Sequence, residues 1–107
     1  MSVYHPDRWM ILEMSNGKQT YKKVFSGNYG GYLGSDTWKL SSAIEKIFED
    51  EKGYEVLCES GSTYMCHKQA YGMSNYMSMI LSGWADEANK PGSEISIKIL
   101  EEYDTRK

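Results

Sequence analysis

The chain has 107 residues, of which 40% are hydrophobic and 25% are charged, and its formal net charge is −3. This length suits one small domain, residues 1–107, with a single thin core, and the composition is that of a globular protein rather than a disordered one. The mild negative charge and the scattered lysines disfavour direct binding to duplex nucleic acid, which requires a clustered basic face.

The N-terminal sequence and the cysteine count predict a cytoplasmic protein. The first residues lack the cationic and apolar regions of a signal peptide, and no apolar stretch approaches the length of a membrane span. The two cysteines, Cys58 and Cys66, are then expected to be reduced, as cytosolic thiols are. Residues 1–8 and 101–107 are expected to be polar tails.

The first predicted elements are the two strands of a hairpin. Residues 9–14 are a dense apolar run of strand length, and residues 19–25 read as the return strand. Asn16-Gly17 between them is the strongest short hairpin signal, because both residue types tolerate positive φ. After a glycine-rich loop, residues 36–41 resume as a strand.

Residues 42–50 carry signals for two structures. Ser42 and Glu45 have the spacing of a helical capping box, and the neighbouring apolar residues fit a helical stripe. The segment is short, however, and leads through residues 50–53 into a strand-like run. A strand followed by a hairpin is the favoured prediction, and a helix is the alternative.

Three more strands are predicted in the second half of the chain. Residues 54–58 and 63–67 flank a Ser-Gly-Ser turn and form a hairpin, and residues 94–100 alternate apolar and polar side chains as a closing strand. A hairpin centred on Ser62 would place the two cysteines opposite each other, whereas a shift of one residue would not.

One helix completes the prediction. Ser74 is a suitable cap for a helix of about residues 74–88, in which apolar residues recur at spacings of three and four. Gly83 is unfavourable in its interior, and close packing against a sheet is the expected benefit. The fold class is therefore α+β: an antiparallel β-sheet of about six to seven strands, built from hairpins, packed against this one main α-helix.

No constellation of catalytic or metal-binding residues is predicted. A zinc site needs four ligands at workable spacing, and Cys58, Cys66, His67 and the remote His5 contain no CxxC pair. Cys66 and His67 are neighbours in a strand, so their side chains point to opposite faces and form a poor nucleophile–base pair. We therefore expect no enzyme activity, no cofactor and no metal.

The most distinctive stretch is the glycine- and aromatic-rich segment from Ser26 to Ser42. Glycine permits positive φ and close backbone approach, and aromatic rings offer large flat contact surfaces with one polar handle. Two roles stay open: a tightly wound connection with a buried tryptophan, or an exposed aromatic rim that contacts a partner. On the second interpretation, the partner- or ligand-binding residues are Tyr29, Gly30, Gly31, Tyr32, Asp36, Trp38 and Lys39.

Two stretches of the chain resemble a known group of proteins. They are NYGGYLGSDTWKLSSAI, from Asn28, and ESGSTYMCHKQAYGMS, from Glu59. Their order and spacing resemble small uncharacterised proteins of tailed bacteriophages, in which a W-x-L-S-S-x-I segment precedes an S-G-S-x-Y-x-C-H-K segment. The resemblance spans about Tyr4 to Leu81 and carries no catalytic residues with it. It implies synthesis in an infected bacterial cytoplasm and action by binding to host enzymes, transcription or defence systems.

Two functions from different classes are predicted for the glycine–aromatic loop. The first is a non-enzymatic phage-type accessory protein that binds a host protein, as an inhibitor of a host or defence enzyme. The alternative is a protein that sequesters a small molecule or nucleotide, with aromatic rings stacking on a base and glycine amides approaching phosphates. Edge strands and the methionine-bearing helix also leave a homodimer open.

Overall fold

The computed structural model describes residues 2–30 and 36–100, apart from the side chains of residues 99 and 100. Within these residues the chain forms two four-stranded sheets and one α-helix. The outer sheet, in the order β1-β7-β6-β5, contains β1 (Val3–Tyr4), β5 (Ile44–Glu49), β6 (Gly53–Cys58) and β7 (Thr63–His67). The central sheet, in the order β4-β3-β2-β8, contains β2 (Arg8–Ser15), β3 (Thr20–Asn28), β4 (Thr37–Leu40) and β8 (Ser96–Leu100).

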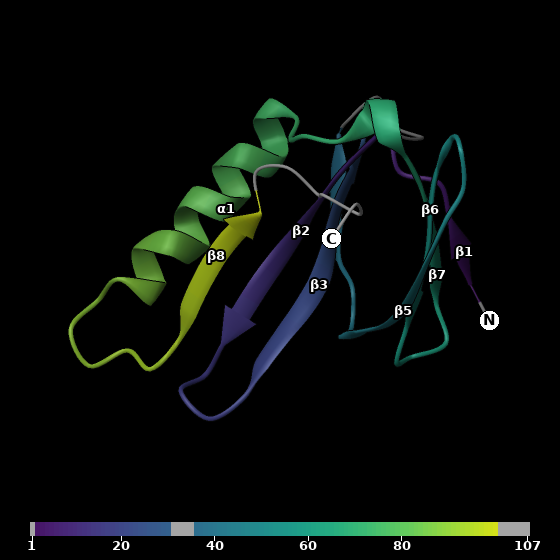
Figure 1. Ribbon diagram of the computed structural model, residues 1–107. Helices are drawn as coiled ribbons and strands as arrows, with labels where there is room; N and C mark the ends of the chain where they lie inside the picture. Colours follow the sequence, from purple (N-terminus) through teal and green to yellow (C-terminus); the bar gives the residue numbers. More distant parts are fainter. Residues whose placement is uncertain (1, 31–35, 101–107) are drawn as a thin grey trace.

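The elements are stacked in three layers, with the central sheet between the outer sheet and helix α1 (Asn75–Ala88) (Figure 1). A short 3-10 helix (Lys68–Ala70) leads from β7 towards α1. The α+β class, the hairpins, the packing helix and the closing strand are confirmed. The strands divide into two sheets rather than one because β2 is buried on both faces. Its residues Trp9 to Leu12 are all buried, so each face of the central sheet needs its own cover.

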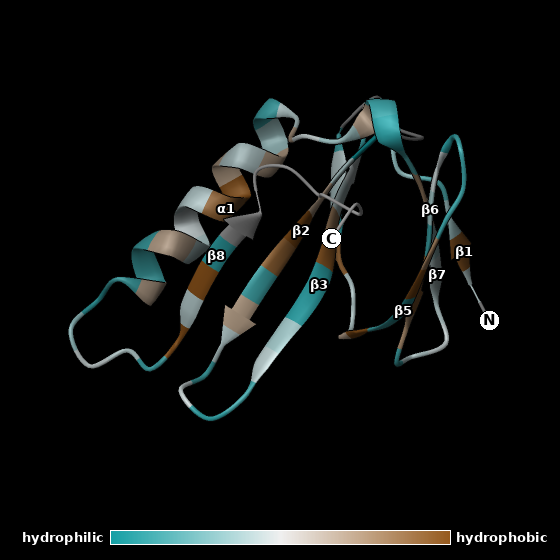
Figure 2. Ribbon diagram, in the orientation of Figure 1, coloured by the Kyte–Doolittle hydropathy of each residue, from teal (hydrophilic) through white to brown (hydrophobic). Residues whose placement is uncertain are grey.

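The larger core lies between the two sheets. The central sheet contributes Trp9, Ile11 and Val24, which alternate with residues that face the helix. The outer sheet contributes the alternating inward-facing residues of β6 and β7. Those residues are Tyr54, Val56, Cys58, Tyr64 and Cys66. Figure 2 shows the hydrophobic middle of β2, which supplies both cores.

The smaller core lies between the central sheet and α1. Leu12 and Phe25 pack there against Met77 and Leu81 of the helix. Gly27 allows this packing, because a Cβ atom at that position would lie 2.8 Å from the Cγ atom of Met77. The helix therefore approaches the sheet closely at its N-terminal end, above β3.

The helix begins as the sequence predicts. The side-chain oxygen of Ser74 accepts a hydrogen bond of 3.1 Å from the N–H of Met77, which satisfies one of the free donors of the first turn. The prediction for Gly83 is wrong: this residue is exposed, and a Cβ atom there would meet nothing within 4 Å. The glycine lies on the solvent side of the helix and packs against no sheet.

The structure tests the first hairpin and the segment at residues 42–50, for which a strand and a helix are both predicted. The first hairpin is confirmed, with Gly17 at φ +89° and the side chain of Asn16 accepting the N–H groups of Lys18 and Gln19. Residues 44–49 form β5, so the strand interpretation is correct and the helix alternative is wrong. The segment joins β6 antiparallel, and pairing with a strand outweighs the weak capping signal.

The N-terminus is more structured than a polar tail. Val3 and Tyr4 pair in parallel with Thr63 and Tyr64 of β7, and Arg8 begins β2, so the predicted tail at residues 1–8 is wrong for residues 3–4 and for Arg8. The partner strand lies sixty residues away along the chain, and no local signal announces such a pairing. The predicted tail at 101–107 lies outside the described residues. No helix in the described part of the chain is both long and apolar enough to cross a membrane.

Candidate binding surface

The start of the glycine–aromatic loop is held by two carboxylates. The N–H of Tyr29 donates to the Asp7 carboxylate at 2.8 Å, and the N–H of Gly30 donates to the Asp36 carboxylate at 3.0 Å. The Tyr29 hydroxyl accepts a hydrogen bond of 3.1 Å from Nε of Arg8, while half of the residue stays exposed. Asp36 therefore stabilises the start of the loop. Tyr29 is held by hydrogen bonds at its backbone N–H and at its hydroxyl group, with its ring between them.

Trp38 and Lys39 lie on opposite faces of β4. The ring of Trp38 faces α1, where its centroid lies 5.1 Å from that of Trp84 and 6.2 Å from that of Phe25. Lys39 faces the outer sheet, and its Nζ lies 4.7 Å from the centroid of the Tyr4 ring as a cation–π contact. Side chains alternate along a strand, so these neighbouring residues, which the sequence-based prediction groups in one site, face opposite sides of the sheet.

The structure thus divides the predicted binding residues. Directly paired residues share a face of the sheet, so Arg8, Gly27 and Trp38 all lie on the side that faces α1. Tyr29 joins them there through its bond to Arg8. Lys39 lies on the other side, and Gly31 and Tyr32 lie outside the described residues.

An apolar groove opens beside Trp84 at the C-terminal end of the helix. It has a volume of about 520 Å³ and lies between α1, β4 and the segment that enters β8. Its lining residues are Met14, Leu40, Trp84, Glu87, Ala88, Ser93, Ile95 and Ile97. Trp84 belongs to the predicted helix and Ile97 to the predicted closing strand. The sequence gives no sign that these two elements leave a gap between them.

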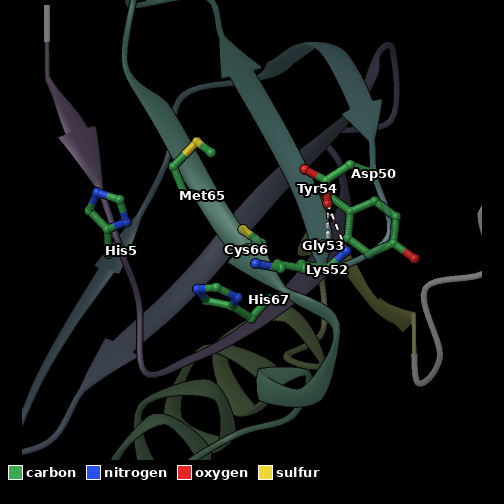
Figure 3. A pocket seen from close by; sticks show the side chains of 8 residues that line it. All are labelled: His5, Asp50, Lys52, Gly53, Tyr54, Met65, Cys66 and His67. Carbon is green, nitrogen blue, oxygen red and sulfur yellow. Dashed lines mark hydrogen bonds between the residues drawn. The ribbon is translucent and has the colours of Figure 1, made fainter.

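A second, smaller hollow of about 220 Å³ lies at the ends of β6 and β7, with His5 and His67 on its rim (Figure 3). The Asp50 carboxylate is occupied by the β5–β6 turn, because it accepts the N–H groups of Lys52 and Gly53 at 2.8 and 2.9 Å. These hydrogen bonds lower the pKa of Asp50. Within the described residues no group of three or more His, Cys, Asp or Glu side chains is arranged to hold a metal ion.

The two cysteines are buried and free. The β6–β7 hairpin pairs Leu57 with Thr63 and Tyr54 with Cys66, so it is not centred on Ser62 and Cys58 does not face Cys66. Burial raises the pKa of the Cys66 thiol to about 12 and also raises that of Cys58. Both thiols are therefore small core side chains and poor nucleophiles.

We expect both thiols to resist a thiol reagent at about pH 8 in the native protein and to react in urea, because only the unfolded chain yields thiolate readily. The raised pKa values also fix the sign of the pH dependence. Native Cys66 keeps its proton above pH 9, where an unfolded thiol loses its proton, so the free energy of unfolding falls as pH rises from about 9 to about 12, and the raised pKa of Cys58 acts in the same direction. Rapid labelling of the native protein would contradict the burial.

Comparisons with family models, curated proteins and solved structures find no match for this chain.

Proposed function

We propose that this chain is a non-enzymatic binding protein of phage type, which docks onto a bacterial host protein and inhibits it. The docking surface is the aromatic face formed by Tyr29, Trp38 and Trp84 with the adjoining groove. The observation that carries the proposal is Trp38, which is 39% exposed although its ring packs against Trp84. A large exposed ring fixed by a second ring is typical of the residues that dominate protein–protein binding energy.

The chemistry of the surface supports a protein partner. Apolar side chains of α1, β4 and β8 surround the groove, and among the described residues that line it Glu87 is the one that carries a charge. Because Glu87 already pairs with Lys90 at 2.9 Å, the groove offers an apolar side chain a place to insert without leaving an unpaired charge. The buried, protonated thiols supply no nucleophile, which favours binding over catalysis.

The nucleotide-sequestering alternative has weaker support. A concave pocket beside an exposed tryptophan suits base stacking. The part of the groove lining that the structure describes, however, contains no cation to meet a phosphate, and Lys39 lies on the opposite face of β4. The Tyr29 and Gly30 amides are bonded to carboxylates, so neither is available to a phosphate in this conformation.

Affinity capture from bacterial cytosol tests the proposal. We expect the tagged protein to enrich one host protein at near-stoichiometric yield, and the double substitution Tyr29→Ala, Trp38→Ala to remove at least about 2 kcal/mol of binding free energy. Phe48→Ala is the matched control, since Phe48 is also an exposed aromatic residue, at 54% against 50% for Tyr29 and 39% for Trp38, but lies on β5 of the outer sheet. Capture that is unchanged by the double substitution in a folded protein would overturn the proposed surface. A nucleotide recovered without a protein partner would favour the alternative.

A further inference from the structure

We propose that the open edge of β3 at residues 20–23 accepts an extended, acidic segment of the partner as an additional strand of the central sheet. This inference rests on the proposed function and deepens it, because it names the kind of segment that the partner presents. The edge begins where β4 stops, next to Leu40, which lines the groove.

The first observation is the short reach of β4. It pairs with β3 only from Phe25 to Asn28, whereas β3 itself begins at Thr20. The pairing ends at Ser41, whose N–H donates to the carbonyl of Val24 at 2.9 Å. Of the strands in the described part of the chain, none pairs with residues 20–23 on this side. Figure 2 shows this hairpin end of β3 as hydrophilic, which is typical of an edge that faces solvent.

The direction of the free backbone groups follows from Val24. Its carbonyl accepts the Ser41 N–H and its own N–H donates to the Ser41 hydroxyl at 2.8 Å, so both groups point towards β4. In an antiparallel strand, alternate residues direct their N–H and C=O groups to the same side. Lys22 and Thr20 therefore direct theirs outwards, at the spacing that an added strand requires.

The side chains around the edge define the segment that fits. A strand added beyond Ser41 continues the row of β4, so every second side chain points to the same side as Leu40 and borders the groove. Those positions favour apolar residues. Lys22 and Lys23 are neighbours in β3, so they face opposite sides of the sheet: Lys23 lies on the side of Leu40 and the groove, and Lys22 lies on the other side, directly across from Glu13 of β2. Acidic residues at the alternate positions of the added strand lie on the side of Lys22 and complement its charge.

A second copy of the chain is a poor occupant of this edge. Antiparallel pairing of two β3 edges centred on Lys22 would place the Lys22 residues of the two copies directly opposite each other. Like charges on paired strands are unfavourable, and lysines on an edge strand are a common protection against self-association. The charge of Lys22 that disfavours a second copy attracts an acidic strand.

The test is a titration of the full-length, 15N-labelled protein with a capped peptide of about eight residues that alternates valine and glutamate. We expect chemical-shift changes at residues 20–23 and slower amide exchange at Thr20 and Lys22, because their N–H groups enter a ladder. The double substitution Lys22→Glu, Lys23→Glu should weaken binding by about tenfold or more. Lys46→Glu, on the edge strand β5 of the outer sheet, is the matched control and should leave binding unchanged.

Four outcomes overturn the inference: no binding, shifts confined to other parts of the protein, equal binding of a peptide with lysine in place of glutamate, or a dimer formed through β3. The charge-reversed variant also separates the two proposals. If it captures the host protein as well as the original chain does, the strand-addition inference fails and the aromatic surface stands. If the Tyr29, Trp38 variant captures normally, the proposed surface fails, whatever the peptide does.

Discussion

Gly53→Ala is expected to destabilise the protein by about 3 kcal/mol or more, the upper range of overpacking effects. Gly53 is buried at the start of β6, directly opposite His67. An added Cβ atom would lie 2.9 Å from the carbonyl carbon of Cys66 and from Cα of His67, and closer still to the Cys66 oxygen. These are backbone atoms of β7, which cannot rotate away as a flexible side chain can. Relief therefore requires the two strands to separate.

Gly83→Ala is the matched control for this experiment. The same chemical change at an exposed helical position, with open space around the new Cβ atom, should raise the free energy of unfolding by about 0.5–1 kcal/mol. Urea denaturation followed by circular dichroism measures both variants. A Gly53→Ala protein as stable as the original would mean that β6 and β7 are not paired as described.

The second large effect is expected for Trp9→Ala, at about 3–5 kcal/mol. Trp9 is buried between the sheets, with its ring centroid 4.7 Å from that of Tyr71 and 5.6 Å from that of Tyr54. Its indole N–H donates to the carbonyl of His67 at 2.7 Å, which ties β2 to the end of β7. Removal of the ring leaves a cavity and a carbonyl without this donor.

Trp9→Phe separates the two contributions. Phenylalanine keeps most of the apolar contact but cannot donate a hydrogen bond, so a smaller loss of about 1–3 kcal/mol is expected. Unfolding of both variants can be followed by the fluorescence of Trp38 and Trp84, which remain. Equal losses for the two substitutions would show that the hydrogen bond, rather than the packing of the ring, holds the sheets together here.

Local signals predicted most of the elements. Asn16-Gly17 marked the first hairpin and Ser74 marked the start of the helix, because turn and cap chemistry depends on residues within a few positions. The division into two sheets was not predicted. The continuous apolar run at the start of β2 indicates that both faces of this strand are buried, but it does not show which elements pack against each face. The short β1 was missed for the same reason, as its partner strand is distant in the sequence.

The residues that the sequence groups in one binding site do not share one face of the structure. Trp38 and Tyr29 lie on the face that the structure makes available, but Lys39 belongs to the opposite face. Trp84 was assigned to the helical packing stripe, and its contact with Trp38 depends on how the helix crosses the sheet. Neither the groove nor the open end of β3 has a local sequence signal, because both arise where one element ends before its neighbour does.

Because the central sheet contributes to both cores, the protein is expected to unfold as one cooperative unit. Ile11 and Leu12 are adjacent in β2 but belong to different cores, and Val24 and Phe25 are divided in the same way. Neither the helix nor the outer sheet can detach without exposing one side of the central sheet to water. The amide protons of α1 and of β6 should therefore be released to solvent exchange by the same global opening, and the protein should behave as one foldon rather than two.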